Sequence, residues 1–529
     1  MPPDKSKDPA GKQKVLIIGA GAAGMSCAAM LAKEPDKFDV TVFERNNQAG
    51  GKASALAING EKFGADWVNR GAQGGVGLYR HTYKFFRDYG YEPKERRLQF
   101  AFGKGKESFW TNVFPTHLQQ KYVSEITRFE KLLRKVQYVP FLWYLPLRHF
   151  LRLFGFSPDF GFKMLYPLVA FFCGSGTQAP NVPCGLFRIL FEDPVIAFWH
   201  FDKESLLPPI VTAYAFPNMT RFYMDWTAGL RAQGVKIRFN TQVLKFIQRD
   251  KAGIVAETRW HDADQRITDE GIQDRNITEL FDKVVFCIPG NQAKELLGTK
   301  ATRMEKLVLG ATKWHNNLNV IHNDSNYFQR KYEAYFREEN CPTVNNKRDE
   351  NRMKYARGEF GRPGFRPTFC TYSYKKNTDN VDVAYDCSRF QYQFQSGDDT
   401  PPIEQHVFSS HFPGKTAHEL WTTDAIDQSL IIEKEWWHKL SYTWRHFAQV
   451  VPGMKFVNGK NNTLYAGAWT FIDMHEGAVI SGMNAAYRLG ARYDKIDDLA
   501  DNLFTYFLKM SHGKKFKRKV ANTRSKRER

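Results

Sequence analysis

The hydrophobic pattern near the N-terminus predicts a strand, a turn and a helix. Four consecutive apolar residues, Val15–Ile18, are followed by a glycine-rich turn and then by the apolar stretch MSCAAMLAK. A second strand-like segment, DVTVFER, follows after a short polar linker. An uninterrupted apolar run of this length is typical of a strand buried on both faces, so the pattern predicts a βαβ unit of a parallel sheet.

The turn in this unit has the spacing GxGxxG. Gly19 permits a tight turn, Gly21 lets the backbone approach a pyrophosphate, and Gly24 lets the helix pack closely on the sheet. The phosphates would lie at the positive end of the helix. Glu44 lies twenty residues past Gly24, where a carboxylate accepts hydrogen bonds from the ribose hydroxyls of an adenosine and repels the 2′-phosphate of NADP. The pattern predicts a dinucleotide site, also lined by Ala20, Ala23 and Arg45.

A second glycine motif distinguishes an FAD-binding site from an NAD-binding site. Gly50, Gly51 and Lys52 form a GGK sequence, and a GADW segment begins twelve residues later. This order resembles the FAD-dependent amine oxidase and phytoene desaturase superfamily, in which the glycine pair and the basic residue run beside the FAD pyrophosphate. The family often has an arginine just before the glycine pair, where this chain has Gln48. The resemblance places a GAxW backbone near the isoalloxazine ring, here Gly64, Ala65, Asp66 and Trp67.

A matching block near the C-terminus spans residues 462–490 and reads NTLYAGAWTFIDMHEGAVISGMNAAYRLG. Thr463–Ala466 predicts a strand, and a helix is expected to start near Glu476–Ala478. The block resembles the superfamily's closing motif, in which a helix N-terminus points at the flavin and stabilises negative charge on the reduced ring. The family usually has an acid where this chain has Ala468. The residues implied at the flavin are Gly467, Ala468, Trp469, Glu476, Gly477 and Ala478.

This version of the closing motif is similar to a subgroup of predicted NAD/FAD-binding flavoproteins associated with cyclopropane-fatty-acid synthase. The resemblance spans most of residues 14–492. Residues 234–248 look like the strand whose Val243 backbone contacts adenine in the superfamily, and residues 282–290 look like a strand that re-enters the same domain. Both segments are also compatible with ordinary buried strands.

The fold class expected is α/β, with a Rossmann-like, glutathione-reductase-like FAD-binding domain and an inserted mixed α+β substrate domain. The FAD-binding domain is assigned to residues 14–75, 230–295 and 455–500. The substrate domain is assigned to residues 76–229 and 296–454. A flexible N-terminus is expected over residues 1–13, and a basic C-terminal tail over residues 505–529.

Composition fits a large folded protein, since the 529 residues are 42% hydrophobic and 25% charged. The net charge of +20 is concentrated at the C-terminus, where residues 514–529 contain nine basic residues and one acid. Such a run is read as a solvated tail, a nuclear import signal or an anchor to anionic lipid. The seven cysteines form no CxxC pair, and neither a signal peptide nor an apolar run of membrane-spanning length is visible. The expected location is cytoplasmic, with peripheral membrane association as an alternative.

Residues 136–173 are especially apolar, and the apolar run is interrupted by the basic residues Arg148, Arg152 and Lys163. They read either as a buried helical layer or as a monotopic surface that admits a lipidic substrate. Among candidate acids and bases, His475 is the best placed, because it precedes the helix that faces the flavin. His475 or Glu476 could shuttle a proton there, although Glu476 could equally cap a helix N-terminus. No metal site is expected, and FAD is expected to carry the redox chemistry.

The resemblance implies an FAD-dependent oxidoreductase that takes hydride from an apolar, lipid-like or polyketide-like substrate, in desaturation or oxidation. A double-bond isomerase without net redox change is the nearest alternative. A third hypothesis, from another class, is a flavin-stabilised binding protein that docks on anionic membrane through its basic tail, with nucleic acid a less favoured partner. The reactive face is expected between the GADW segment and the GAW–HEG loop, with the cavity opening toward residues 136–200.

Overall fold

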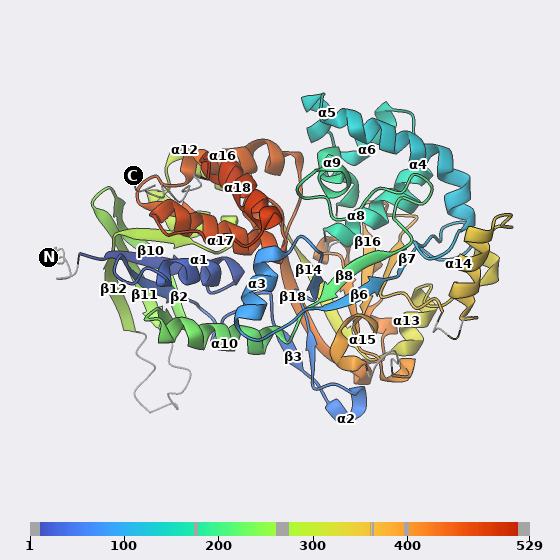
Figure 1. The fold of residues 1–529 in the computed structure, drawn as a ribbon, viewed down its shortest axis with the longest axis horizontal. Helices are drawn as coiled ribbons and strands as arrows, with labels where there is room; N and C mark the ends of the chain where they lie inside the picture. The colour runs from blue at the N-terminus through green and yellow to red at the C-terminus, as the bar shows by residue number, and fades with distance from the viewer. Residues whose placement is uncertain are drawn as a thin grey trace, which may run out of the picture.

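The computed structural model describes residues 11–173, 178–260, 275–359, 361, 364–395 and 401–516. In Figure 1 the parallel sheet and its helices lie on the left, and a second sheet with a helical layer above it lies on the right. The architecture is mixed α/β, which confirms the fold class expected from the sequence.

The N-terminal pattern builds a five-stranded parallel sheet with the order β19-β13-β1-β2-β9. Its centre is β1, in which Val15, Leu16 and Ile17 are fully buried, as expected for a strand covered on both faces. The strands come from distant parts of the chain: β1 (Gln13–Ile18), β2 (Phe38–Phe43), β9 (Lys236–Arg238), β13 (Lys283–Phe286) and β19 (Thr463–Tyr465). An antiparallel sheet of β10 (Thr241–Asp250), β11 (Gly253–Trp260) and β12 (Arg275–Phe281) lies beside it.

Helices from both chain ends pack on the parallel sheet. Helix α1 (Ala22–Ala32) lies against α17 (His475–Leu489), where a Cβ added at Gly482 would stand 2.0 Å from the carbonyl oxygen of Ala23. The Ser26 hydroxyl donates to the Val479 carbonyl at 2.9 Å. Small residues at this crossing therefore bring the N-terminal and C-terminal blocks into direct contact. Other helices on this side are α3 (Arg80–Asp88), α10 (Met219–Ala232), α11 (Gly290–Leu297), α12 (Arg303–Gly310) and α16 (Val451–Val457).

The second sheet has six strands in the order β18-β14-β17-β16-β15-β7. All neighbouring pairs are antiparallel except β15 and β7, which run parallel. Its strands are β7 (Phe100–Phe102), β14 (Trp314–His322), β15 (Phe369–Ser373), β16 (Val381–Asp386), β17 (Phe408–Phe412) and β18 (Ile431–Leu440). The smaller strands form a β3–β4 hairpin and a β5-β8-β6 sheet: β3 (Ala55–Ala57), β4 (Trp67–Asn69), β5 (Gly74–Gly75), β6 (Lys94–Leu98) and β8 (Val211–Ala215).

A helical layer covers this sheet on one side (Figure 1). Most large side chains of the apolar stretch 136–173 point inward, including Phe150, Phe160, Met164 and Leu168, which are fully buried. The layer consists of α4 (His117–Val136), α5 (Pro140–Tyr144), α6 (Leu147–Leu153), α7 (Pro158–Phe160), α8 (Tyr166–Phe172) and α9 (Cys184–Glu192). Short helices complete this half: α2 (Gly60–Phe63), α13 (Ser325–Lys331), α14 (Lys347–Arg357) and α15 (Cys387–Phe390).

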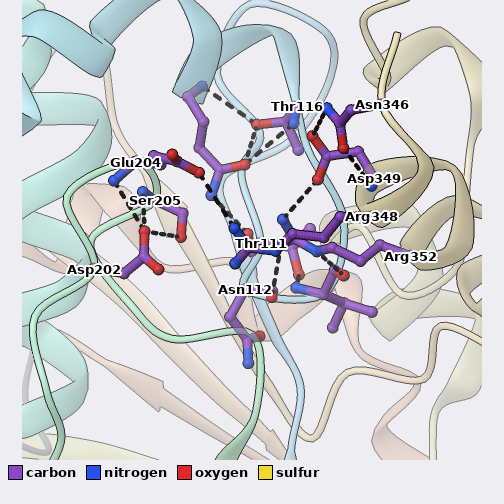
Figure 2. A network of polar contacts seen from close by, with 12 residues as sticks. Thr111, Asn112, Thr116, Asp202, Glu204, Ser205, Asn346, Arg348, Asp349 and Arg352 are labelled. Atoms are coloured by element: carbon purple, nitrogen blue, oxygen red, sulfur yellow. Dashed lines mark hydrogen bonds and ion pairs between the residues drawn. The ribbon is translucent and has the colours of Figure 1, made fainter. Parts of the chain in front are cut away.

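A polar network joins the start of the helical layer to α14 (Figure 2). Thr116 and Gln119 form a capping box at the N-terminus of α4. The guanidinium of Arg352 donates to the carbonyl oxygens of Val113 at 3.0 Å and Asn112 at 3.1 Å. Buried backbone carbonyls need such partners, so Arg352 fixes the loop before α4 against α14.

The C-terminal residues correct the boundary expected for the basic tail. Helix α18 (Asp498–His512) includes residues 505–512 and packs on α16 and α17. Its buried Leu503, Phe504, Phe507 and Leu508 recur at helical spacing, a pattern typical of a helix with one apolar face. Residues 517–529, which hold most of the predicted tail, lie outside the described residues. Among the described helices, none is long and apolar enough to cross a membrane.

Candidate functional site

The glycine turn before α1 is closed by Gly19, which the sequence assigned to the tight turn, and by Gly24, which it assigned to close packing. Gly19 has φ +100°, and its N–H donates to the Phe43 carbonyl at 2.8 Å. A Cβ at Gly24 would stand 1.9 Å from the carbonyl oxygen of Gly19. Neither position tolerates a side chain, because backbone atoms cannot move aside as a flexible side chain can.

Gly21 differs, because a Cβ added there would meet no atom within 4 Å. The second glycine pair faces this open space: a Cβ at Gly51 would lie 3.6 Å from the Gly21 Cα. The Gly50 N–H donates to the Ala20 carbonyl at 2.9 Å and fixes the two loops together. The open space lies before the first turn of α1, whose free N–H groups attract anions. This cradle fits a pyrophosphate.

Glu44 lies at the adenosine end of the same site. Its buried carboxylate accepts hydrogen bonds from the Ala20 and Asn46 N–H groups, both at 2.9 Å. A carboxylate offers about four lone-pair sites, so acceptor capacity remains for ribose hydroxyls. The Thr241 N–H donates to the Glu44 carbonyl at 2.9 Å and brings the start of β10, with buried Val243, to this end. Arg45 is exposed beside it.

The closing block lies where α17 meets α1. Gly467 has φ +135°, and its N–H donates to the Ser481 hydroxyl at 2.8 Å. Trp469 is buried, and its indole N–H donates to the Ile288 carbonyl at 3.0 Å, after β13. A Cβ at Gly477 would stand 2.7 Å from the Ile472 carbonyl oxygen. The block is therefore a tightly packed turn, on which Ala468 and Ala478 stay half-buried.

The two proton-transfer candidates are both engaged by α3. Glu476 is buried, and its carboxylate accepts from the N–H groups of His81 at 2.9 Å and Thr82 at 2.8 Å, in the first turn of α3. Glu476 therefore caps a helix N-terminus, the alternative that the sequence offered, and the capped helix is the neighbouring α3. His475 is held between the Thr82 hydroxyl at 3.0 Å and the Tyr223 hydroxyl at 2.9 Å.

Burial lowers the pKa of His475 to about 4, so its ring is neutral at pH 7. Neither His475 nor Glu476 lines either of the two cavities described below. Their contacts join α3 and α17, and the expectation that they handle protons beside a substrate stays a prediction.

The GADW segment also needs a correction. Gly64 and Asp66 are exposed at the outer end of the β3–β4 hairpin, next to α2. Figure 1 places α2 at the lower edge of the molecule, away from α1 and α17. Buried Ala65 and half-buried Trp67 pack within this hairpin region, where Trp67 contacts Tyr392. The glycine-rich run after β4, residues 70–77, takes the inner position instead.

Gly71 shows how close this run lies to the GGK loop. A Cβ at Gly71 would stand 2.2 Å from the Lys52 carbonyl oxygen. The following residues, Gln73–Val76, line a cavity of about 230 Å³. Sequence reasoning missed this segment, although its signal was available as four glycines within seven residues, GAQGGVG.

The lining of the cavity has an aromatic part and a polar part. Phe171, Phe172, Phe198 and Trp199 come from α8 and the segment after α9, inside the region 136–200 that the sequence associated with the substrate. The polar part is formed by Arg70, which follows β4, by His411 of β17, and by Lys439 beside Trp437 on β18. A second cavity of about 70 Å³ shares Tyr79, Phe172 and Phe198 with the first and adds Leu186 and Leu190 of α9.

Positive charge collects near the polar wall. Lys439 is only 8% exposed, and burial and the nearby charge of Lys52 lower its pKa to about 7, against the opposing effect of Asp473. Lys52 also lowers the pKa of His315, which burial brings to about 4. The charge of the GGK lysine thus reaches Lys439 and His315 of the large sheet. Among the described residues, no cluster with metal-binding composition is present.

Comparisons with known proteins agree with this geometry. The NAD(P)-binding Rossmann-like domain family matches residues 17–89. A phytoene desaturase of Phycomyces blakesleeanus is 53% identical over 49 residues, which are 9% of this chain and 8% of that protein. A 1-hydroxycarotenoid 3,4-desaturase of Flavobacterium is 43% identical over 51 residues, 10% of each chain. The matched segment is thus at most a tenth of these relatives' length.

Solved structures match along nearly the whole chain. The fatty acid isomerase of P. acnes that produces CLA superposes with a TM-score of 0.58 at 14% identity, covering 92% of this chain and 100% of that one. Cyclohexylamine oxidase of Brevibacterium oxydans gives a TM-score of 0.55 at 11% identity, covering 93% and 99%. The chain has the fold of the FAD-dependent amine oxidase and desaturase superfamily. Its glycine cradle and Glu44 fit FAD, the cofactor of this superfamily.

Proposed function

We propose that this flavoprotein is an FAD-dependent oxidoreductase that takes hydride from an apolar, lipid-like substrate. The observation that carries the proposal is the position of the aromatic cavity. Part of its lining is the glycine-rich run 70–77, which touches the GGK loop of the dinucleotide site, and another part is built from Phe171, Phe172, Phe198 and Trp199. Ligand sites are mostly apolar with a few placed polar groups, and this cavity has that composition.

The chain's own residues supply binding, orientation and exclusion of water. The cradle of Gly21 and Gly51 and the N-terminus of α1 hold the pyrophosphate, while Glu44 holds the adenosine ribose. The aromatic wall excludes water from the reacting carbon atoms, and the half of the cavity nearest run 70–77 receives them. Bound FAD supplies the two-electron acceptor at its isoalloxazine ring.

The experiment starts from purified protein, which is expected to be yellow and to release FAD on denaturation. Anaerobic mixing with a panel of long-chain fatty acids, alcohols and polyenes is expected to bleach the flavin absorbance with an apolar member. Polar amines such as putrescine are the matched comparison. Bleaching by amines alone, or recovery of FMN in place of FAD, would overturn the proposal.

Double-bond isomerisation is the second candidate, favoured by the fold similarity to the P. acnes fatty acid isomerase. An isomerase returns the hydride, so product forms without consumption of an electron acceptor. Substrate turnover with a stoichiometric loss of oxygen or of an added quinone identifies the oxidoreductase. Turnover with no acceptor consumed identifies the isomerase.

A further inference from the structure

One face of the six-stranded sheet is graded from polar to apolar. In an antiparallel sheet, directly opposed residues point to the same face. His411 on β17 opposes Asn319 on β14, which in turn opposes Glu435 on β18. Trp437 and Lys439 follow Glu435 at every second position and so share its face. Toward the other edge the same face continues through Tyr385 and Phe369.

The cavity covers this gradient, so an elongated ligand in it meets aromatic side chains at one end and polar ones at the other. The polar end has two side chains that are at least nine-tenths buried, His411 at 4% exposed and Lys439 at 8%. Buried polar atoms without a partner are costly. The hydrogen-bonding state of the His411 ring therefore indicates which ligand group fits at the polar end of the cavity.

His411 needs a hydrogen-bond donor. The hydroxyl of Ser409 donates to Asn319 Oδ1 at 2.8 Å, which uses its one proton. His411 Nε2 lies 3.1 Å from the same hydroxyl and must therefore donate to it. Burial and Lys439 hold the pKa of His411 well below its ordinary value, so the ring is neutral. Nδ1 then carries a lone pair, and it is buried with no partner in the described parts of the chain.

Lys439 supplies hydrogen-bond donors, which complement the acceptor lone pair of His411. Its Nζ lies over the Trp437 ring at 4.7 Å, and below pH 7, where the group is an ammonium, it carries donors only. A ligand oxygen between the two side chains would accept from Lys439 and donate to His411. A hydroxyl group does both, an ether or ketone oxygen only accepts, and a carboxylate offers His411 no proton.

We propose that Lys439 and His411 bind a hydroxyl group on the otherwise apolar substrate. This inference rests on the proposed function, because it assigns the head group of the molecule that occupies the same cavity. It makes the substrate class an apolar alcohol, held with its hydroxyl at the β14-β17-β18 side and its hydrocarbon against the aromatic wall.

The test measures binding to the FAD-loaded protein by calorimetry, with octanol, methyl octyl ether and octanoate as probes. Octanol is expected to bind about tenfold more tightly than the ether, because only octanol satisfies the buried Nδ1. His411→Phe should remove this preference, and His411→Asn, which retains an acceptor, should restore part of it. Lys439→Met should weaken both octanol and ether, since both accept from the ammonium group.

His438→Gln is the matched control, because His438 lies between Trp437 and Lys439 on the opposite face of β18 and should leave all affinities unchanged. Equal binding of octanol and ether would overturn the proposal, as a water molecule would then satisfy Nδ1. Tighter binding of octanoate would also overturn it, since a charge pair with Lys439 would dominate. Absence of FAD from the purified protein would instead contradict the proposed function.

A second surface carries an independent inference. Between the end of α4 and the end of α6, apolar side chains point to solvent: Tyr138 is 77% exposed, Phe141 66% and Leu153 59%. We call residues 138–153 the apolar ridge, and its exposed members also include Val139 and Tyr144. The helix α5 that bears Phe141 lies at the outer edge of the molecule in Figure 1. Exposed apolar surface of this kind marks an interaction site.

Charge around the apolar ridge favours an anionic bilayer as its partner. Residues 131–153 contain five lysines or arginines and no acidic residue, and Lys131, Lys135 and Arg152 are exposed. Basic residues beside inserted aromatic and aliphatic side chains are typical of an interfacial membrane contact. The ridge is also connected to the cavity. The ring of Trp143 on α5 packs against Gly185 of α9, and Leu186 and Leu190 of α9 line the smaller cavity.

We infer that the apolar ridge inserts into the surface of an anionic membrane, from which apolar substrate reaches the cavity along α9. The full chain is expected to cosediment with phosphatidylcholine vesicles that contain phosphatidylserine, and less with phosphatidylcholine alone. Phe141→Asp with Leu153→Asp should reduce this binding about tenfold. Met224→Asp, an exposed apolar residue on α10, is the matched control and should leave it unchanged.

Deletion of residues 517–529 distinguishes vesicle binding by the apolar ridge from vesicle binding by the basic tail. Vesicle binding that survives the deletion but not the ridge substitutions supports the inference. Binding that survives the ridge substitutions and is lost with the tail would overturn it, as would no binding to either kind of vesicle.

Discussion

Two glycines of the same turn are expected to respond differently to alanine, because one faces backbone and the other faces open space. Gly24→Ala should lower the melting temperature and the yield of folded protein, since overpacking against a carbonyl costs about 1–3 kcal/mol or more. Gly21→Ala should fold normally and bind FAD more weakly, because its methyl group occupies the cradle. Thermal unfolding of the apoprotein and FAD titration measure the two effects. Full FAD affinity in Gly21→Ala would contradict the cradle.

The buried amine of Lys439 predicts a pH dependence of stability. Its pKa is about 7 in the folded chain and 10.5 ordinarily. Between these values the unfolded chain binds more protons than the folded one, so this residue makes stability rise with pH from about 7 to about 10. Lys439→Met should remove that rise in the free energy of unfolding, measured in denaturant. Lys306→Met, at an exposed position, should retain it; an unchanged slope in Lys439→Met would show that the lysine is not desolvated.

At the scale of elements, the contact between α3 and α17 depends on one carboxylate. Glu476 accepts two backbone N–H groups and lies 2.7 Å from His81 Nδ1. Glu476→Gln should lower the free energy of unfolding by about 1–3 kcal/mol, because a buried charged acceptor at a helix N-terminus is lost. The exposed substitution Glu92→Gln is the control. Normal stability with lost flavin reduction would instead restore a direct chemical role for Glu476.

Elements formed by local pattern could be predicted from the sequence, and contacts set by long-range pairing could not. The strand, turn and helix of residues 13–32 follow from apolar runs and glycine spacing. The position of the GADW segment was wrong, because the hairpin inserts α2 and so carries that segment outward. His411 and Lys439 were missed, since neither belongs to a sequence motif and they lie on different strands. Only the pairing of β17 and β18 on either side of β14 brings them together.

At the scale of the whole molecule, the described chain ends in an aromatic contact, and residues 517–529 after it carry seven lysines or arginines. Phe516 contacts the rings of Tyr487, Tyr493 and Phe504 at centroid distances of 5.8, 5.4 and 5.7 Å. Removing residues 517–529 should therefore leave FAD content and melting temperature unchanged, whereas Phe516→Ala should lower the melting temperature by removing aromatic packing. Differential scanning calorimetry checks both variants. Unfolding caused by the deletion would assign the removed residues a structural role.

The meeting of α1 with α17 has a consequence for biosynthesis. The glycine turn and α1 are translated before β19 and α17, which complete the same domain. Until then the small-residue face of α1 lacks its partner, and long-range pairing of this kind makes folding slow. We therefore expect the cofactor to be captured only after α17 has been translated. A nascent chain interrupted before residue 475 would leave that face of α1 exposed.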